Sequence, residues 1–477
     1  MASRPTGSGP IPGSDFLQLV KEDAPKHGLT TWLTEGLRDA IGEGRLPTGS
    51  SLPATRRLAE ELGISRGVVV EAYQRLIDEG LAGARTGAGT VVIARGTPAG
   101  EPRDRRRLLD RLRLPLPPAD GIDLDLSPGV PDLAAFPRTG WLRAERAVLA
   151  EVSAADLGYG DPGGSPRLRA ELASWLARTR GVRGEPDDVI VVSGVAQALG
   201  LLAQTLRASG TTAVAVEDPG SRGARDQLAH WGVRGVPVPV DDEGVRVDAL
   251  TEPVAVLTPA HQFPTGVVLS PPRRRALLAW ASGGGLIVED DYDAEHRYDR
   301  SPVAALQGSL PDHVAYAGSV SKSLAPGMRL GWLVAPRHRQ SHLLAAKHAT
   351  DLGNPALPQL VLARLLATGD YERHLRHVRT RQRRRRDALL AGLRTHLPGA
   401  RVAGVAAGLH LLVMMDGDTP DTELASLAAR AGVLVHPLSW HRIAPGPPGL
   451  VIGYAAHPPD RLASVGRRLR EAFSRRP

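Results

Sequence analysis

The chain has no cysteine, only four lysines among its 477 residues, and few aromatic residues. Without cysteine it can form no disulfide, thiol nucleophile or thiolate metal site. Its most apolar stretch, residues 191–206, contains Ser193 and Gln197 and is too short to cross a bilayer. The first residues also lack a charged segment followed by an apolar one, which a secretion signal needs. We therefore expect a cytoplasmic protein that has no membrane partner.

Charge and composition describe a basic but otherwise ordinary globular protein. Lys and Arg total 59 against 51 Asp and Glu, so the formal net charge is +8. A basic surface favours a nucleic-acid partner, but only weakly at this length. The scarcity of lysine is more informative, because chemistry that needs an amine has few candidates. These are Lys21, Lys26, Lys322 and Lys347.

The length exceeds what one hydrophobic core usually organises, so a multidomain protein is expected. We divide it into a flexible N-terminal arm (1–28), a small helical domain (29–94), a basic proline-containing linker (95–119) and a large domain (120–477). In the large domain, helical patterns alternate with short β-branched runs. These runs cover residues 189–192, 213–216, 254–257 and 286–288. The alternation predicts an α/β fold with a mostly parallel central sheet.

Two helices joined by a tight turn are predicted in the small domain. The apolar residues at 58, 59 and 62 share one helical face, and Gly63 can end that helix in the left-handed conformation. Ser65 can cap the second helix. This spacing is typical of a helix-turn-helix, whose second helix would present Ser65 and Arg66 to DNA at its positive N-terminus. The same geometry also occurs as ordinary core packing, so the pattern alone leaves DNA binding open.

A hairpin signal follows at residues 81–84 and 90–93, where Arg85 and a glycine-rich turn could approach phosphate. The region also contains Leu52-Pro53, Arg56, Leu58-Ala59, Leu62-Gly63, Ser65-Arg66, Ala72-Tyr73, Glu79-Gly80-Leu81, Gly87 and Gly89-Thr90. By these residues it resembles the winged helix-turn-helix of the GntR family. The resemblance implies that Arg56, Ser65, Arg66 and the wing from Gly87 to Gly89 contact double-stranded operator DNA. Two positions depart from the family pattern, Ala54 and Val68, where Ser and Thr are usual.

A serine-rich segment between an apolar strand and a turn of Pro and Gly contains Lys322. The hydroxyl residues Ser321 and Ser323 flank this lysine, and Arg329 follows seven residues later. The alternative is an exposed lysine in a polar loop, which is the usual fate of lysine. Pyridoxal phosphate needs an amine for its aldehyde, a carboxylate for its pyridine nitrogen and donors for its phosphate. Lys322 is the candidate amine.

Residues 286–293 begin with an apolar segment that is typical of a buried strand. A cluster of carboxylates and Tyr292 follow it. Ligands bind where strands end in open α/β sheets, so Asp290 can pair with the pyridine nitrogen and Tyr292 can donate to the phenolic oxygen. Asp291 and Asp293 also fit a metal site or a solvated turn, and spacing does not choose among the three aspartates. We predict no metal. A second strand leads into Gly194 and Val195, where the free amides of a helix N-terminus can hold a phosphate.

Together these motifs resemble aminotransferase-like proteins of fold type I. With the winged helix in front, the chain is similar to the MocR/GabR-type regulators across residues 30–470. The resemblance also covers Pro128-Gly-Val-Pro-Asp, Phe136-Pro with Trp141, Tyr159-Gly-Asp-Pro, Glu217-Asp-Pro-Gly, Pro259-Ala-His-Gln-Phe-Pro-Thr-Gly and His374-Leu-Arg. It implies that Lys322 carries pyridoxal phosphate, that Ser319 and Arg329 hold its phosphate, and that Tyr159 reaches the phosphate from the partner subunit. A homodimer is therefore expected.

Several positions depart from that resemblance. Ser221 stands where an aromatic residue commonly lies near the cofactor ring. Phe263 replaces an Asn, which leaves His261 or Gln262 as possible donors to the cofactor. Val451 stands where aminotransferases carry the arginine that clamps the substrate carboxylate through two hydrogen bonds. The possible substitutes for that arginine are Arg222, Arg225 and Arg442.

The sequence therefore supports two main functions. The first is a transcriptional regulator whose large domain senses a small-molecule effector, either pyridoxal phosphate itself or an amine or amino acid. The alternative is an active aminotransferase that the winged helix tethers to DNA. A third interpretation, a cofactor-free dimerisation domain, requires Lys322 to be inert. Loss of the carboxylate clamp favours the regulator, because such a hydrogen bond to a charged group contributes about 1.5 to 3 kcal/mol. We predict no catalytic residue, although residual half-transamination is compatible with the sequence.

Overall fold

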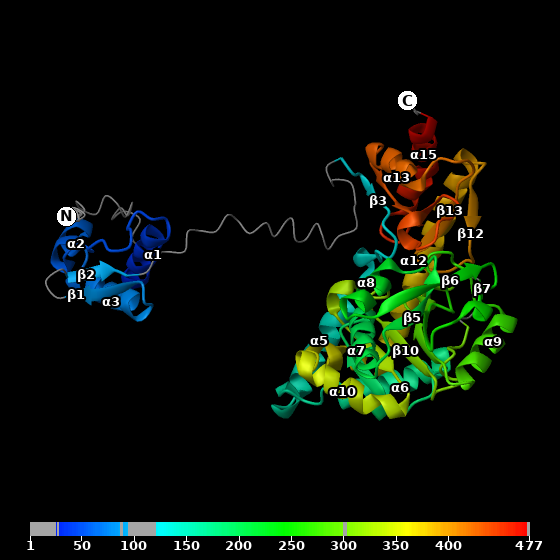
Figure 1. Ribbon diagram of the computed structural model, residues 1–477, viewed down its shortest axis with the longest axis horizontal. Coiled ribbons are helices and arrows are strands. Elements are labelled where there is room, and N and C mark those ends of the chain that lie inside the picture. Colours follow the sequence, from blue (N-terminus) through cyan, green and yellow to red (C-terminus); the bar gives the residue numbers. More distant parts are fainter. Residues whose placement is uncertain (1–24, 26–27, 86–88, 94–120, 299–302, 475–477) are drawn as a thin grey trace, which may run out of the picture. The chain divides into compact units, whose positions relative to one another are not determined.

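The computed structural model describes residues 25, 28–85, 89–93, 121–298 and 303–474. The chain forms two compact units, residues 1–116 and 117–477 (Figure 1). The predicted linker, Gly87 of the predicted wing and all but two residues of the predicted arm lie outside the described residues.

The small unit is a winged helix. Its elements are α1 (Leu29–Gly42), α2 (Thr55–Leu62), α3 (Arg66–Asp78), β1 (Ala82–Arg85) and β2 (Gly89–Val92). Gly63 ends α2 at φ 61°, and the Ser65 hydroxyl accepts the Val68 amide at 3.4 Å to begin α3. Both features confirm the predicted turn. Ala54 gives α2 no side-chain cap, which agrees with its departure from the family pattern.

The wing is the antiparallel pair of β1 and β2, with Arg85 opposite Gly89. Each strand reaches one residue further towards the turn than predicted. Gly89 makes this possible, because its φ of 75° is readily available only to glycine. This conformation lets the second strand begin directly at residue 89.

The large unit contains an eight-stranded sheet in the order β4-β11-β10-β9-β8-β5-β6-β7. The strands are β4 (Val189–Val192), β5 (Ala213–Asp218), β6 (Arg234–Asp241), β7 (Gly244–Val245), β8 (Val254–Leu257), β9 (Leu286–Asp290), β10 (Val314–Ser319) and β11 (Gly331–Val334). The pairs from β10 through β9, β8 and β5 to β6 are parallel, whereas β11 runs antiparallel to both neighbours. The predicted mostly parallel sheet is confirmed.

Helices cover both faces of this sheet (Figure 1). Val189 and Val191 pack with α6 (Pro166–Arg180) and α11 (Ala356–Ala367). Ile190 and Val192 pack on the other face with α7 (Val195–Ala208) and α10 (Arg337–Asp351). Because successive side chains point to opposite faces, a strand covered on both sides is apolar throughout. Further helices of this region are α5 (Arg138–Glu151), α8 (Arg222–His230) and α9 (Pro271–Ser282).

A smaller antiparallel sheet lies towards the C-terminus, in the order β12 (Arg401–Ala403), β13 (His410–Met414), β16 (Gly449–Gly453) and β15 (His436–Pro437). The helices that follow the large sheet here are α12 (Asp370–His396), α13 (Asp421–Arg430), α14 (Pro459–Ala463) and α15 (Val465–Ser474). β14 (Val433–Leu434) pairs with β3 (Leu124–Asp125), which ties the start of the unit to its end. Within the described part of the chain, no helix has both the length and the apolar character needed to cross a membrane.

Candidate cofactor site and DNA-reading surface

The candidate cofactor residues lie along one edge of the large sheet. β4, β5, β8, β9 and β10 run in the same direction, so their carboxyl ends share this edge. Asp290 and Ser319 end two of these strands, and Gly194 follows a third. β11 runs the opposite way and begins here, shortly after Arg329. Ligands of open α/β sheets bind outside the carboxyl ends of the strands, so the topology gathers motifs that are far apart in sequence.

Lys322 follows β10 at this edge and is half-buried. Its Nζ donates to the Gly129 carbonyl oxygen at 2.5 Å. Gly129 has φ 85°, and a Cβ at this position would lie 2.9 Å from Nζ, so a side chain here would crowd the amine. Burial lowers the pKa of Lys322, while the charges of Asp293 and Asp290 oppose that shift. This amine therefore loses its proton more readily than an ordinary lysine.

The three aspartates that spacing left open have different partners. Asp291 Oδ2 accepts a hydrogen bond from Arg180 Nε at 2.7 Å, and both side chains are buried. Asp293 Oδ2 lies 2.9 Å from His261 Nδ1. Among the described residues, no ion pair includes Asp290, and its buried Oδ1 has no hydrogen-bond partner. The buried Asp291 Oδ1 also has no partner, but Asp291 is already paired with Arg180 through its other oxygen. Asp290 is thus the aspartate whose carboxylate remains available to a cationic ligand.

The Asp290 carboxylate is held in surroundings that disfavour its negative charge. Burial raises the pKa of Asp290 to about 7, and the carboxylates of Asp291, Asp293 and Glu217 add to this rise, while Lys322 opposes it. A cation with an N–H group beside the carboxylate would lower the pKa of Asp290 again. It would also give Oδ1 a hydrogen-bond donor. A protonated pyridine nitrogen supplies both, so the site fits the ring of pyridoxal phosphate.

Gly194, Ser321 and Arg329 surround a small space at the start of α7. Gly194 has φ 95°, and a Cβ there would lie 3.6 Å from Arg329 Nη1 and 3.8 Å from Ser321 Oγ. The first amides of a helix, here from Val195 onward, have no acceptor within the helix and carry partial positive charge. Arg329 itself has φ 51°, a strained conformation that is concentrated at functional sites. A guanidinium, a hydroxyl and helix amides around one glycine fit a phosphate group.

Tyr292 and His261 form a hydrogen-bonded group beside the aspartates. The Tyr292 hydroxyl and Asp293 Oδ2 lie 3.0 and 2.9 Å from His261 Nδ1. Burial raises the pKa of Tyr292 well above its usual value, and the Asp293 charge adds to this rise. The phenol therefore keeps its proton at neutral pH and can donate a hydrogen bond.

The protein itself uses both amide hydrogens of Gln262, whereas Ser319 accepts one hydrogen bond and keeps its hydroxyl donor. Gln262 Nε2 donates to the carbonyl oxygens of Pro219 and Phe263, at 2.9 and 2.6 Å, and its Oε1 accepts from the turn that follows. The buried Ser319 Oγ accepts the Ser321 amide at 3.3 Å. Both residues brace the loops that carry other site residues. Gln262 has no donor left for a cofactor, which differs from the expectation drawn from its sequence position.

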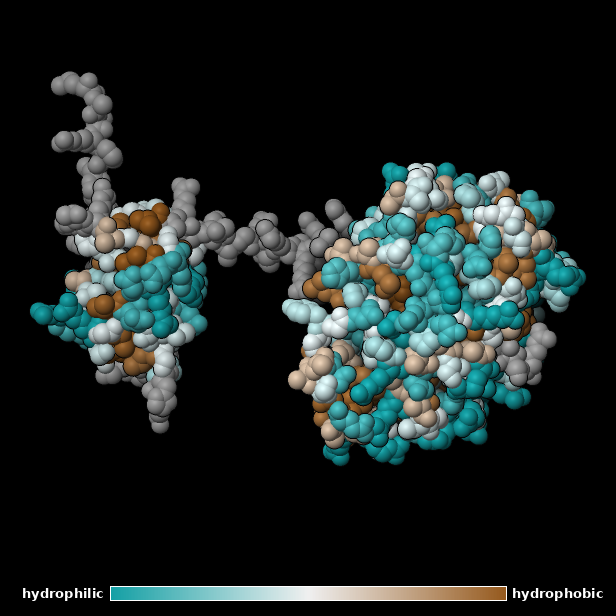
Figure 2. Space-filling model, turned by 90° about the horizontal axis from the view of Figure 1, so that it is seen from below, coloured by the Kyte–Doolittle hydropathy of each residue, from teal (hydrophilic) through white to brown (hydrophobic). Residues whose placement is uncertain are grey.

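Tyr159 stands apart from these groups within one chain. Its side chain is 88% exposed and follows the short helix η4 (Ala155–Leu157). The preceding Leu142, Leu149 and Leu157 are also largely exposed. Figure 2 shows apolar patches between hydrophilic residues on the surface of the large unit. Leu142 and Leu149 are seven residues apart in α5 and therefore share one face of that helix.

A buried network anchors the turn before α7, and sequence patterns gave little sign of it. Gln197 accepts the Ser193 amide at 2.7 Å and donates to Asp351 Oδ2 at 2.6 Å. The fully buried Lys347 donates to Asp351 and Asn354, and Asn354 Nδ2 donates to Ser193 Oγ at 2.8 Å. Only the four-residue spacing of Lys347 and Asp351 could have indicated this pair. Lys347 is therefore a structural cation and not a candidate amine.

The N-termini of α2 and α3 present polar side chains to solvent. Arg56, Ser65 and Arg66 are all exposed. Among the described residues, no ion pair includes Arg56 or Arg66, whereas the neighbouring Arg57 pairs with Glu61 at 2.8 Å. Arg66 Nε donates to Thr55 Oγ1 at 3.4 Å, a long contact that leaves its two terminal nitrogens for DNA. Exposed guanidinium groups at a positive helix end are suited to phosphates and base edges.

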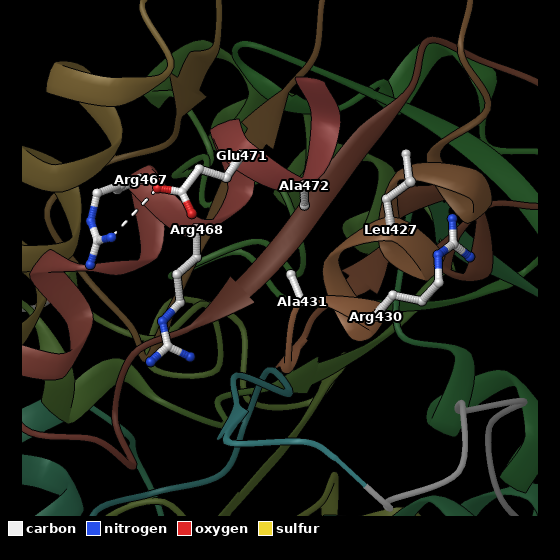
Figure 3. Close-up of a pocket in the computed structure, with 7 residues that line it drawn as sticks. All are labelled: Leu427, Arg430, Ala431, Arg467, Arg468, Glu471 and Ala472. Carbon is white, nitrogen blue, oxygen red and sulfur yellow. Dashed lines mark hydrogen bonds and ion pairs between the residues drawn. The ribbon is translucent and has the colours of Figure 1, made fainter. Parts of the chain in front are cut away.

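A cleft of about 600 Å³ between α13 and α15 lies outside this set of residues (Figure 3). Arg430, Arg467 and Arg468 line it. Arg467 pairs with Glu471 at 3.5 Å, and Arg468 pairs with Asp123 at 2.8 Å. Arg430 lies in the last turn of α13, where a cation is favourable at the negative end of the helix dipole. The charges of this cleft thus have structural explanations.

The fold and these sites define a class of protein, a winged-helix DNA-binding domain joined to a domain of the aminotransferase fold. Residues 122–469 match the family described as aminotransferase class I and II. Residues 30–92 match the bacterial regulatory proteins of the gntR family.

Full-length relatives share this organisation. The HTH-type pyridoxine biosynthesis transcriptional regulator PdxR of Corynebacterium glutamicum is 34% identical over 452 residues, which cover 94% of this chain and 96% of the relative. The probable rhizopine catabolism regulatory protein MocR of Rhizobium meliloti is 34% identical over 480 residues, which cover 94% of each chain. A solved structure of Pyrococcus horikoshii kynurenine aminotransferase matches with a TM-score of 0.69 and 25% identity, covering 78% of this chain and 94% of that one. The chain belongs to the MocR-type family of helix-turn-helix transcriptional regulators, which carry an aminotransferase-like domain.

Proposed function

We propose that the large domain binds pyridoxal phosphate at Lys322 and that the bound state sets the affinity of the winged helix for operator DNA. The unpartnered carboxylate of Asp290 carries this proposal, because a protonated pyridine nitrogen supplies the cation that it lacks. When bound, pyridoxal phosphate supplies an aldehyde that an amine can capture. The residues assigned to the phosphate are Gly194, Val195, Ser319, Ser321 and Arg329, while Tyr292, oriented by His261, donates to the phenolic oxygen.

We infer that the working unit is a homodimer. The exposure of Tyr159 and of the leucines before it supports this inference, because burial against a second copy would remove that apolar surface from water. In such a dimer Tyr159 of one subunit reaches the phosphate held by the other. Paired winged helices then read two half-sites of the operator.

The effector that we assign first is pyridoxal phosphate itself. The relative PdxR is named as a regulator of pyridoxine biosynthesis, and a site shaped for the cofactor can report its concentration directly. The corresponding targets are genes for making the cofactor.

An active aminotransferase is the second candidate function, and the match to that family over residues 122–469 favours it. The pocket argues against turnover. Val451 is fully buried in β16, in one apolar cluster with Leu412 and Leu438. Arg225 donates only to backbone carbonyl oxygens, and Arg442 Nη1 donates to the Pro447 carbonyl oxygen at 2.7 Å. Arg222 Nε lies 3.6 Å from the exposed Asp226 carboxylate. The three possible substitutes named from the sequence thus have other partners in the described part of the chain, so we propose a regulator without a completed transamination cycle.

Lys322 is expected to capture pyridoxal phosphate at lower pH than an ordinary lysine. The neutral amine is the nucleophile, and a lowered pKa raises its fraction at every pH below the usual lysine value. The capture rate, followed by absorbance, should therefore level off at a lower pH than the rate for Nα-acetyl-lysine, which keeps accelerating up to its own pKa of about 10.4. A protein rate that climbs tenfold per pH unit as far as the free lysine does would contradict this prediction.

Arg66→Ala is expected to weaken operator binding about 5- to 150-fold, which corresponds to about 1 to 3 kcal/mol for a good arginine contact. Fluorescence anisotropy with labelled DNA from upstream of the protein's own gene measures the change. Arg57→Ala is the matched control, because Glu61 already neutralises Arg57 on the neighbouring helix. The spectrum of bound cofactor should be the same in both variants. Equal DNA affinity of the two variants would show that α3 does not read the operator as we propose.

The cofactor half of the proposal is tested by peptide mass mapping. Purified protein is loaded with pyridoxal phosphate, reduced with borohydride and digested. A cofactor mass on the peptide containing Lys322 is expected, and an unmodified Lys322 peptide in saturating cofactor rejects the proposal.

A further inference from the structure

His436 and His441 form a buried pair of imidazoles. His436 lies in β15, and His441 ends the short helix η9 (Leu438–His441). The side chains are 5% and 4% exposed, and their rings stack with centroids 5.8 Å apart and planes 17° apart. Among the described residues, none of the four ring nitrogens has a hydrogen-bond partner. Such an arrangement needs an explanation, because each buried unsatisfied polar group costs about 1 to 3 kcal/mol.

The aromatic ring of Phe263 connects the pair to the candidate cofactor site. The ring of Phe263 is 5.0 Å from that of His441 and 6.1 Å from that of Tyr292. In the ladder between β15 and β16, His436 stands directly opposite Val451. His436 therefore lies beside the position at which aminotransferases carry the carboxylate-binding arginine.

The chemistry of the pair is that of two neutral imidazoles. Burial lowers the pKa of His436 to about 4 and that of His441 to about 3, and for His441 the neighbouring His436 and Arg225 lower it further. A neutral imidazole has one N–H donor and one acceptor nitrogen. The pair thus offers two donors and two acceptors, with the apolar side chains of Leu438 and Val451 nearby in the fold.

Two cations and one carboxylate face the pair. They are Arg222 and Arg225 on α8 and Asp125 on β3, whereas the buried His410 on β13, whose pKa is lowered to about 4, is neutral. Arg225 donates to the carbonyl oxygens of Trp440 and His441, and these contacts also fix η9 against α8. Oxygen atoms that carry negative charge would therefore find both hydrogen-bond donors and a favourable potential beside these rings.

We propose that His436 and His441 bind the carboxylate of a small amino-acid effector that occupies the site together with the cofactor. This proposal rests on the proposed function, because the cofactor defines where the rest of the effector lies. The imidazole N–H groups donate to the carboxylate oxygens.

The test uses cofactor-loaded protein and a series of unbranched ω-amino acids of two to six carbons. The matching monoamines, which lack the carboxylate, are the control ligands. Calorimetry and the shift of cofactor absorbance report binding. At least one amino acid should bind tenfold or more tightly than its monoamine at the same pH.

Two variants locate the carboxylate. His436→Phe and His441→Phe keep the ring shape but remove the nitrogens, so amino-acid affinity should fall at least tenfold while monoamine affinity stays the same. His441→Gln keeps a donor and an acceptor and should retain part of the affinity. The matched control is His230→Phe, which changes an exposed histidine on α8. Because the nitrogens have no partner, the phenylalanine variants should unfold at the same temperature as the parent protein or higher.

Three results would overturn the inference. These are equal affinity for amino acids and monoamines, unchanged amino-acid affinity in both phenylalanine variants, and no binding of any member of the series. Each leaves the proposed function intact as long as borohydride still fixes the cofactor on Lys322. Failure of that fixation in the parent protein instead counts against the proposed function.

Discussion

Lys322→Ala is expected to abolish the fixation of pyridoxal phosphate by borohydride and to remove the visible absorbance of the loaded protein. The described part of the chain holds one other lysine, Lys347, whose Nζ already donates to Asp351 and Asn354. It cannot take over the capture of the aldehyde. The measurement is the absorbance spectrum combined with the mass of the reduced protein.

Lys322→Arg is the matched control for charge. Arginine keeps the cation beside Asp290 and Asp293 but remains protonated and captures no aldehyde. Both variants should keep their operator affinity in the absence of cofactor, because the winged helix has its own core. Cofactor that remains fixed to either variant would place the reactive amine elsewhere.

Asp290→Ala is expected to weaken cofactor binding about thirtyfold or more. Removing one partner of a buried, hydrogen-bonded charge pair costs about 2 to 5 kcal/mol. The same change should stabilise the cofactor-free protein against unfolding, because it removes a buried carboxyl group whose pKa is raised to about 7. A raised carboxylate pKa means that stability falls as pH rises from the usual value near 4 to about 7. The gain in the melting temperature of the variant should therefore be larger at pH 8 than at pH 5.

Equilibrium titration with pyridoxal phosphate and thermal unfolding at both pH values measure these two effects. Asp187→Ala is the matched control, since Asp187 is 91% exposed and pairs with Arg169 at the surface. A variant at Asp290 that binds the cofactor as tightly as the parent protein would remove this residue from the site.

The winged helix was largely predictable because its signals are local. Gly63 and Ser65 determine the turn through their own backbone preferences, and the structure has both in the expected roles. The wing differed by one residue because the conformation of Gly89 depends on its pairing with Arg85, which no single-residue preference encodes. The parallel sheet was predictable for a similar reason, since strands covered on both faces are apolar throughout.

The details of the cofactor site depend on contacts between distant segments, so the sequence left them open. Asp290 could be separated from Asp291 only by the position of Arg180, which lies in another helix. Gln262 has the side chain of a cofactor donor, but the fold directs its amide to Pro219 and Phe263. The histidine pair escaped sequence analysis entirely, because neither residue forms part of a motif.

The measurement that most directly tests the central claim is an operator titration with and without pyridoxal phosphate. DNA from upstream of the protein's own gene is labelled, and protein is added at constant salt. Our account predicts that the cofactor shifts the binding midpoint at least fivefold, since coupling between two sites is typically about 1 to 3 kcal/mol. The shift should disappear in Lys322→Ala. Identical midpoints with and without cofactor, for a protein shown to carry it on Lys322, would contradict the claim that this domain is a sensor.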